Sequence, residues 1–375
     1  MPAVRPPDAR DFKFDGFGLA FNPRNDRIPF AFQSLPEKNS AMSTAIPNRF
    51  GLAAMLAVVT FLASGSLAKQ ATRASLLVLN KTDNTLAIVD PVTLQVIGRV
   101  PTGEAPHELT ASADGRLAFV ANYGTVPKPG NTISVIDIAA RKEIKRVDLG
   151  PLLRPHGITW SGGKIYFTIQ GSLAVARYDP ASERVDWVVG TGQNGTHMFL
   201  VTPDFKKAYT ANVGSGTVTS IEIGNTPGGA VLKTIAVGKG PEGMDLSPDG
   251  RELWVGHRQD GGLSIIDTSS DTVKETIKVG RAPIRVKFTT DGKRVLVSDS
   301  EGGDVAVFEQ SSRKELKRIP IGSVPVGILI IPDGSRAFVA STGANKVLVI
   351  DLKTLAVVGS IEPGREPDGM AWAGR

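Results

Sequence analysis

The sequence predicts an all-β fold, a seven-bladed β-propeller that is closed by pairing of its N- and C-terminal strands in one blade. A motif recurs with a period of roughly 40 to 48 residues, the length of a propeller blade. Glycine and proline make up 41 and 25 of the 375 residues, as many short strands joined by tight turns require. Apolar segments also end in an acidic residue at one fixed point of the repeat.

Each copy of the repeat begins with a glycine, and in most copies a proline and an apolar strand follow. The copies begin at Gly103, Gly150, Gly190, Gly238, Gly280, Gly322 and Gly364. In most copies an Asp-Gly pair leads to a second strand, because these residues accept the positive φ of a two-residue hairpin. A fourth strand follows the third strands, which end at Asp90, Asp137, Asp179, Glu222, Asp267, Glu309 and Asp351.

The two ends of the repeat region are out of phase and together complete one blade. Residues 74–100 supply the second to fourth strands of a blade without a first strand, and Gly364–Arg375 supplies a first strand alone. We therefore expect Pro367–Trp372 to pair with Leu76–Asn80, which closes the ring and removes its open sheet edge.

The N-terminal segments differ from the repeats. Residues 1–41 are rich in proline and lack periodicity, so we expect a disordered extension or translation from a spurious upstream start. Residues 42–68 have the features of a signal peptide, because the apolar run Phe50–Ala63 follows Arg49 and precedes small residues. This run is too short to span a bilayer comfortably. We expect residues 69–375 to be a periplasmic or secreted propeller with no membrane span after cleavage.

The composition excludes several kinds of site. The chain has no cysteine, which excludes disulfides and thiolate metal sites. Its net charge of +6 is mild, and basic pairs such as Arg141-Lys142 and Arg313-Lys314 recur on the fourth strands. Lysine and arginine on an outermost strand discourage edge-to-edge pairing, so nucleic acid is disfavoured as a partner.

One position of the repeat holds three of the four histidines of the chain. It follows the proline of the motif, at the start of the strand that lines the central channel, and we call it the slot. Around the ring the slot holds His107, His156, His197, Glu242, Ile284, Val326 and Asp368. Because the polar members are consecutive, they predict one polar wall at the channel mouth.

Three imidazoles and a carboxylate form the ligand set of catalytic zinc and of several iron, nickel and copper sites. His107, His156, His197 and Glu242 are therefore predicted to bind a divalent metal ion of unknown identity. Glu242 is the fourth ligand or a catalytic base, and Asp368 orients His107. If the three imidazoles share an ion, they converge to within about 4 Å of a common point.

The end of the second strand gives a second polar ring on the same face. It consists of Asn80, Asn122, Gln170, Asn212, His257, Asp299 and Ser341. Asn122, Gln170 and Asn212 are predicted to bind a small polar ligand or the imidazoles, although asparagine also hydrogen-bonds turn backbone. His257 departs from its amide equivalents and is a predicted catalytic base. Arg285 is predicted to bind an anionic or carbonyl group, with a solvated loop charge or an inter-blade ion pair as the alternative.

Three segments, Val120–Tyr123, Thr210–Val213 and Ser247–Arg251, resemble the YVTN-family β-propeller repeat, and the resemblance covers residues 74–375. Similar propellers include lactonase-like hydrolases, a streptogramin-type lyase and DNA binders, so the resemblance implies the fold and leaves the function open. It also implies that Pro-His-Gly is a frequent form of the slot. Shared descent can therefore leave three histidines that hydrogen-bond neighbouring loops with no ion between them.

Two functions follow as expectations. The first is an exported propeller that binds a metal ion and a small oxygen-bearing organic ligand at the channel mouth, as a metal-dependent hydrolase, lyase or oxidoreductase. The alternative is a non-catalytic propeller that binds a periplasmic protein partner or nucleic acid. The alternative predicts that each histidine is dispensable singly.

Overall fold

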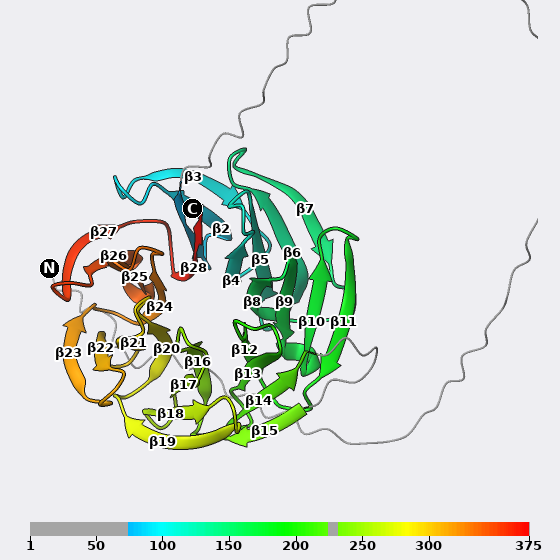
Figure 1. The fold of residues 1–375 in the computed structure, drawn as a ribbon. Helices are drawn as coiled ribbons and strands as arrows, with labels where there is room; N and C mark the ends of the chain where they lie inside the picture. The colour runs from blue at the N-terminus through cyan, green and yellow to red at the C-terminus, as the bar shows by residue number, and fades with distance from the viewer. Residues whose placement is uncertain (1–73, 224–231, 375) are drawn as a thin grey trace, which may run out of the picture. The chain divides into compact units, whose positions relative to one another are not determined.

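The computed structural model describes residues 74–223 and 232–374, and it confirms the seven-bladed β-propeller (Figure 1). Seven four-stranded antiparallel sheets form a ring, with the first strands nearest its centre and the fourth strands at its rim. The predicted N-terminal extension, 1–41, and signal peptide, 42–68, lie outside the described residues. No helix in the described part of the chain is long and apolar enough to cross a membrane.

The blades are numbered here from the first complete sheet. The strands of blades 1 to 3 are β4 (Pro106–Ala111), β5 (Leu117–Gly124), β6 (Pro129–Asp137), β7 (Lys142–Asp148), β8 (Pro155–Ser161), β9 (Lys164–Ile169), β10 (Ala174–Asp179), β11 (Arg184–Gly190), β12 (Thr196–Val201), β13 (Lys207–Asn212), β14 (Thr217–Glu222) and β15 (Leu232–Ala236).

The remaining blades repeat the same order. The strands of blades 4 to 7 are β16 (Pro241–Leu246), β17 (Glu252–His257), β18 (Gly262–Asp267), β19 (Thr272–Lys278), β20 (Pro283–Phe288), β21 (Arg294–Asp299), β22 (Asp304–Glu309), β23 (Glu315–Pro320), β24 (Pro325–Ile330), β25 (Arg336–Ser341), β26 (Lys346–Asp351), β27 (Ala356–Ile361), β28 (Pro367–Ala373), β1 (Ser75–Asn80), β2 (Thr85–Val89) and β3 (Val96–Pro101).

Blade 7 closes the ring as the sequence predicts. The C-terminal strand β28 pairs antiparallel with β1, and Leu76 lies opposite Trp372 while Val78 lies opposite Met370. Figure 1 shows β28, in red, beside the N-terminal strands of the same blade. Because β1 is buried along its whole length, removal of β28 would expose an apolar edge.

The hydrophobic core is divided among the junctions between blades. Among the described residues it forms seven clusters, and each cluster joins side chains from two neighbouring sheets. Phe119 of blade 1 and Phe167 of blade 2, for example, share one cluster. Apolar side chains on both faces of the second and third strands supply these layers, as in other repeat folds in which neighbours bury one another.

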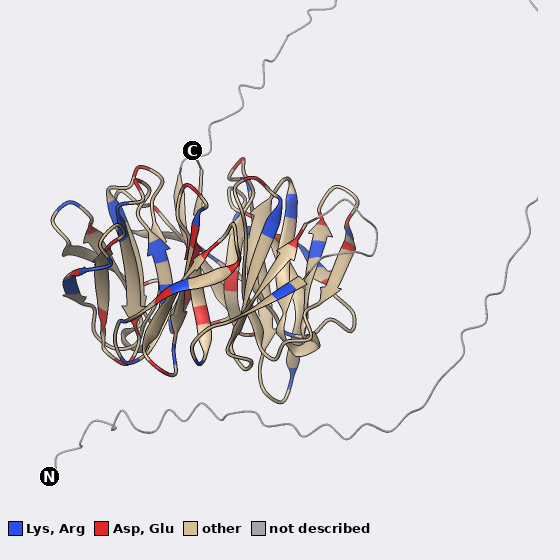
Figure 2. Ribbon diagram, turned by 60° about the horizontal axis from the view of Figure 1, so that its bottom comes forward, with Lys and Arg blue, Asp and Glu red and all other residues tan. Residues whose placement is uncertain are grey.

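The fourth strands consist mostly of exposed and half-buried residues. In β7 only Val147 is buried, and the charged residues Lys142, Lys145 and Arg146 of this strand reach the surface. Figure 2 shows lysine and arginine interspersed with aspartate and glutamate over the blades.

Candidate functional site at the mouth of the ring

A β-bulge in every blade sets the direction of the slot side chain. In blade 1, Pro106 pairs with Asn122 and Glu108 pairs with Ala121, so that His107 is the extra residue of β4. The same kind of irregularity lies between the first and second strands of the other six blades. A bulge re-aims a side chain relative to the regular pleat. The repeated bulge therefore gives the slot residues a common direction.

Five slot residues form a continuous row from blade 7 to blade 4. The ring centroids of His107 and His156 lie 5.0 Å apart, and the rings of His156 and His197 are stacked at 3.7 Å. A carboxylate ends the row on each side. Asp368 Oδ2 lies 3.6 Å from His107 Nδ1, and Glu242 Oε1 lies 3.6 Å from His197 Nε2. We call these five residues the histidine row.

Burial keeps two of the imidazoles uncharged at neutral pH. It lowers the pKa of His107 from 6.5 to about 4, although the charge of Asp368 acts in the opposite direction. Burial also lowers the pKa of His156 well below 6.5, and the neighbouring His197 adds to this effect. Burial would raise the pKa of Glu242, but His197 and Arg258 outweigh it and lower the value to about 2. The row therefore combines neutral imidazoles with an ionised carboxylate.

Cationic side chains pair with both carboxylates of the row. Lys81 Nζ lies 3.3 Å from Asp368 Oδ2, and Arg258 Nη1 donates to Glu242 Oε2 at 3.1 Å. The charge of Asp368 raises the pKa of Lys81, which keeps this lysine protonated. The two ends of the row therefore carry little net charge.

The row contains the predicted metal ligands, but its rings are not arranged around one point. Two imidazoles that bind one tetrahedral ion at about 2 Å have ring centres about 5 Å apart. The distance between His107 and His156 fits this value, whereas the 3.7 Å stack of His156 and His197 does not. Gln170 Oε1 also lies 3.0 Å from His197 Nδ1. Within 74–223 and 232–374, no three His, Asp or Glu side chains are placed to hold an ion together.

Two buried atoms of the row have no hydrogen-bond partner in the described protein. They are His156 Nδ1 and Asp368 Oδ1, in residues that are each only 4% exposed. A buried polar atom without a partner costs about 1 to 3 kcal/mol, so native proteins satisfy such atoms with water or a ligand. The middle and one end of the row therefore have unused capacity for a ligand.

The second polar ring mostly holds the loops that lead into the first strands. Asn122 Oδ1 accepts a hydrogen bond from Gly103 N at 3.0 Å, and its amide donates to Thr132 and Ser134. Asn212 Oδ1 accepts from Thr196 Oγ1 at 3.2 Å. Gln170 is the predicted member of this ring that contacts the histidine row, through His197.

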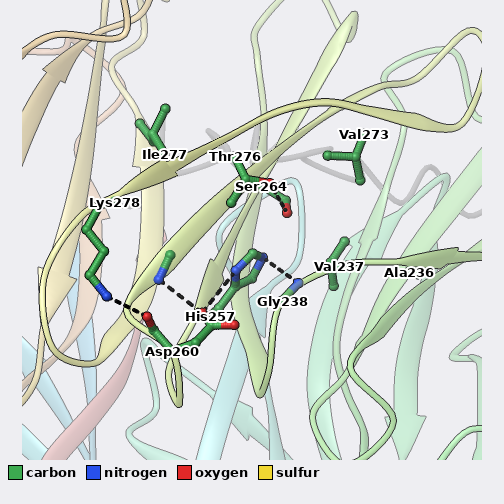
Figure 3. Close-up of a pocket in the computed structure, with 11 residues that line it drawn as sticks. Ala236, Val237, Gly238, His257, Asp260, Ser264, Val273, Thr276, Ile277 and Lys278 are labelled. Carbon is green, nitrogen blue, oxygen red and sulfur yellow. Dashed lines mark hydrogen bonds and ion pairs between the residues drawn. The ribbon is translucent and has the colours of Figure 1, made fainter.

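His257 takes the place of these amides in blade 4. Its Nε2 accepts a hydrogen bond from Gly238 N at 3.2 Å, and its Nδ1 lies 3.3 Å from Asp260 Oδ1 (Figure 3). Burial lowers the pKa of His257, and the residue has 0% exposure. A cavity of about 450 Å³ lies beside it, lined also by Asp260, Thr276 and Lys278. The structure thus places His257 in the loop-binding ring, apart from the other three histidines.

Three side chains at the row were missed by the sequence analysis. Lys81 and Arg258 pair with its carboxylates, and the Tyr123 ring lies 4.8 Å from His107 and 5.4 Å from His156. Each of the three directly follows a member of the second polar ring. Their shared position, one residue beyond the end of the second strand, was the available signal.

Comparison with known proteins supports the fold alone. Neither a protein family nor a curated protein matches the sequence. Among solved structures, Kuenenia stuttgartiensis hydrazine synthase has a TM-score of 0.66 and 22% identity, over 74% of this chain and 92% of that chain. Dihydro-haem d1 dehydrogenase NirN in complex with DHE has a TM-score of 0.59 and 19% identity, over 77% of this chain and 64% of that chain.

A third structure is a Bacteroides uniformis protein provisionally assigned as a 6-phosphogluconolactonase. It has a TM-score of 0.67 and 14% identity, over 80% of this chain and 99% of that chain. All three share the propeller. At these identities the likeness establishes the fold and leaves the YVTN family resemblance as an expectation.

Proposed function

We propose that this protein is an exported propeller that binds a small oxygen-bearing organic molecule at the histidine row and acts on it as a hydrolase, lyase or oxidoreductase. One observation carries the proposal: His156 Nδ1 and Asp368 Oδ1 are buried without partners in a row whose two carboxylates are each paired with a cationic side chain. A ligand with donor and acceptor oxygens would satisfy both atoms.

The residues of the row suit a polar ligand of low charge. The neutral imidazole of His156 either accepts or donates a hydrogen bond, depending on its tautomer. Asp368 forms an ion pair with Lys81 and lies beside His107. Asp368 and His107 together can accept a proton from a bound hydroxyl group or water. Tyr123 provides an aromatic face next to both imidazoles.

A divalent metal ion is the second part of the proposal. The 5.0 Å spacing and neutral state of His107 and His156 suit two ligands of one ion. Such an ion would polarise a carbonyl group or activate water. In the present arrangement His197 and Glu242 hold each other and other partners, so they could join the ligand set only if the His197 ring turned.

The four histidines of the chain make the proposal directly testable by NMR. Full-length protein without a purification tag is labelled with ¹³C,¹⁵N-histidine and titrated with Zn²⁺, γ-butyrolactone, acetaldehyde and sodium propanoate. We expect at least one organic probe to shift the His156 signal and leave the His257 signal in place, and the His156→Gln variant to lose the response of the row.

Metal analysis by mass spectrometry accompanies the titration. A stoichiometric metal that is lost in His107→Gln and in His156→Gln would support the metal part, and no metal after reconstitution would refute that part. If no organic probe moves any signal of the row, the ligand-binding proposal is refuted. Partner capture with the row variants would then test the alternative of a scaffold for a periplasmic protein.

A further inference from the structure

The repeat position directly after the slot has a preferred residue type, which the slot itself does not have. It is glycine in four blades, and a Cβ at each of them would lie within 2.6 Å of a backbone oxygen of the next blade. The contacts are Gly157 with His197 O at 2.6 Å, Gly243 with Ile284 O at 2.4 Å, Gly327 with Asp368 O at 2.2 Å, and Gly369 with His107 O at 2.4 Å. The position therefore favours glycine for packing, and its exceptions need another explanation.

The three exceptions are Glu108, Met198 and Arg285, and Arg285 contacts the other two. Arg285 Nη2 donates to Glu108 Oε1, and Arg285 Nη1 lies 3.5 Å from Met198 Sδ. These residues belong to blades 5, 1 and 3, none of which are neighbours. The Arg285 side chain therefore crosses the centre of the ring, one residue further along the first strands than the histidines.

The guanidinium of Arg285 is incompletely satisfied. It carries five N–H donors on Nη1, Nη2 and Nε. Nη2 donates to the Glu108 carboxylate, whereas Nη1 has only the thioether of Met198, a weak acceptor. Its Nε is buried and has no partner in the described protein, and the residue is only 9% exposed. A buried, charged donor without an acceptor is costly, which points to an anionic oxygen as the missing partner.

Arg285 and the histidine row belong to one electrostatic site. The positive charge of Arg285 contributes to the lowered pKa of His156. Burial would lower the pKa of Arg285, but the charges of Glu108, Asp368 and Glu242 outweigh it and raise this pKa. Lys81, Arg258 and Arg285 each pair with one carboxylate, so the site is close to neutral before a ligand binds.

We infer that Arg285 binds the carboxylate of a small organic acid that lies beside His156. This inference rests on the proposed function and names its ligand class. The planar guanidinium matches the two oxygens of a carboxylate, and Glu108 is a positioning residue that holds the guanidinium at the centre of the ring. An incoming carboxylate competes with Glu108 for the positive charge, so removing the charge of Glu108 favours the ligand.

Propanoate and propanamide test the inference because they differ in charge and hardly in size. Their binding to the full chain is followed by the His156 signal of ¹³C,¹⁵N-histidine protein and by the Arg285 Nε signal of ¹⁵N-arginine protein. We expect propanoate to bind at least about tenfold more tightly than propanamide, as the strength of a charge-assisted hydrogen bond requires. The Arg285→Gln variant loses this preference, whereas Glu108→Gln increases the affinity for propanoate several-fold.

Lys287→Gln is the matched control, since it removes one positive charge from the same strand and leaves the centre of the ring intact. The affinity of this variant for propanoate should equal that of the wild type. Equal binding of acid and amide by the wild type would overturn the inference, as would unchanged propanoate binding by Arg285→Gln. If Arg285→Gln does not fold, an unchanged affinity in Glu108→Gln overturns it instead. Binding of γ-butyrolactone without a preference for carboxylate would refute the inference and leave the proposed function standing.

Discussion

Acid should destabilise the protein through the imidazole of His107. The pKa of His107 is about 4 in the folded chain and 6.5 when the side chain is free in solution. Between these values the unfolded chain binds a proton that the folded chain does not, so the free energy of unfolding falls as the pH falls. At about 1.4 kcal/mol for each pKa unit, His107 alone costs about 2 kcal/mol by pH 5 and about 3 kcal/mol by pH 4. These are upper values, because the side chain is 26% exposed.

Urea unfolding from pH 7 to pH 4.5, for the wild type and His107→Gln, measures this effect. Glutamine cannot gain the proton, so we expect the variant to have a shallower loss of stability over this interval. Glu242 does not contribute to the change in stability above about pH 4.5. Its pKa of about 2 lies below the usual value of 4.5, so its stabilisation is complete above pH 4.5 and is lost only as the pH falls below that value. Parallel pH profiles for the two proteins would refute the burial argument for the row.

Three further changes test the fold around the site. His257→Asn should keep the melting temperature and the NMR signals of the row, because asparagine binds the same loop in other blades, whereas His257→Leu should cost about 1 to 3 kcal/mol; equal stabilities would contradict this role. Gly327→Ala should lower the melting temperature, since its Cβ would meet Asp368 O at 2.2 Å, while Gly190→Ala, with nothing within 4 Å, should not. A chain that ends at Glu366 lacks β28 and should aggregate on size-exclusion chromatography, unlike one that lacks only Arg375; a monomeric truncated chain would show that closure is dispensable.

The fold was predictable because it depends on features that every blade repeats. The period, the Asp-Gly turns and the incomplete blade at each end are local properties of the sequence, and they specify both the blade number and the pairing of β28 with β1. The slot was predictable for the same reason. A single position in the repeat determines which residues meet at the mouth, and the row of His107, His156 and His197 follows from it.

The orientation of the rings was not predictable, because it depends on contacts between blades. Nothing in the repeat indicates that Gln170 binds His197 or that His156 and His197 stack, and both features bear on whether one metal ion can join them. The meeting of Arg285 and Glu108 was hidden in the same way. Their sequence separation is 177 residues, and only the closed ring brings them together.

The repeat also explains why the second polar ring was harder to interpret than the slot. A position that carries an amide or acid in most blades meets a requirement of every blade. Here Asn122 and Asp299 bind backbone groups of the loop before the first strand, and Asn212 binds the hydroxyl group of the first residue of that strand. The next position along the chain has no residue type that the blades share. Lys81, Tyr123 and Arg258, directly after that ring, differ from blade to blade and contact the row. In a propeller the structural role of a position thus lies in what its copies share, and the site lies where neighbouring copies differ.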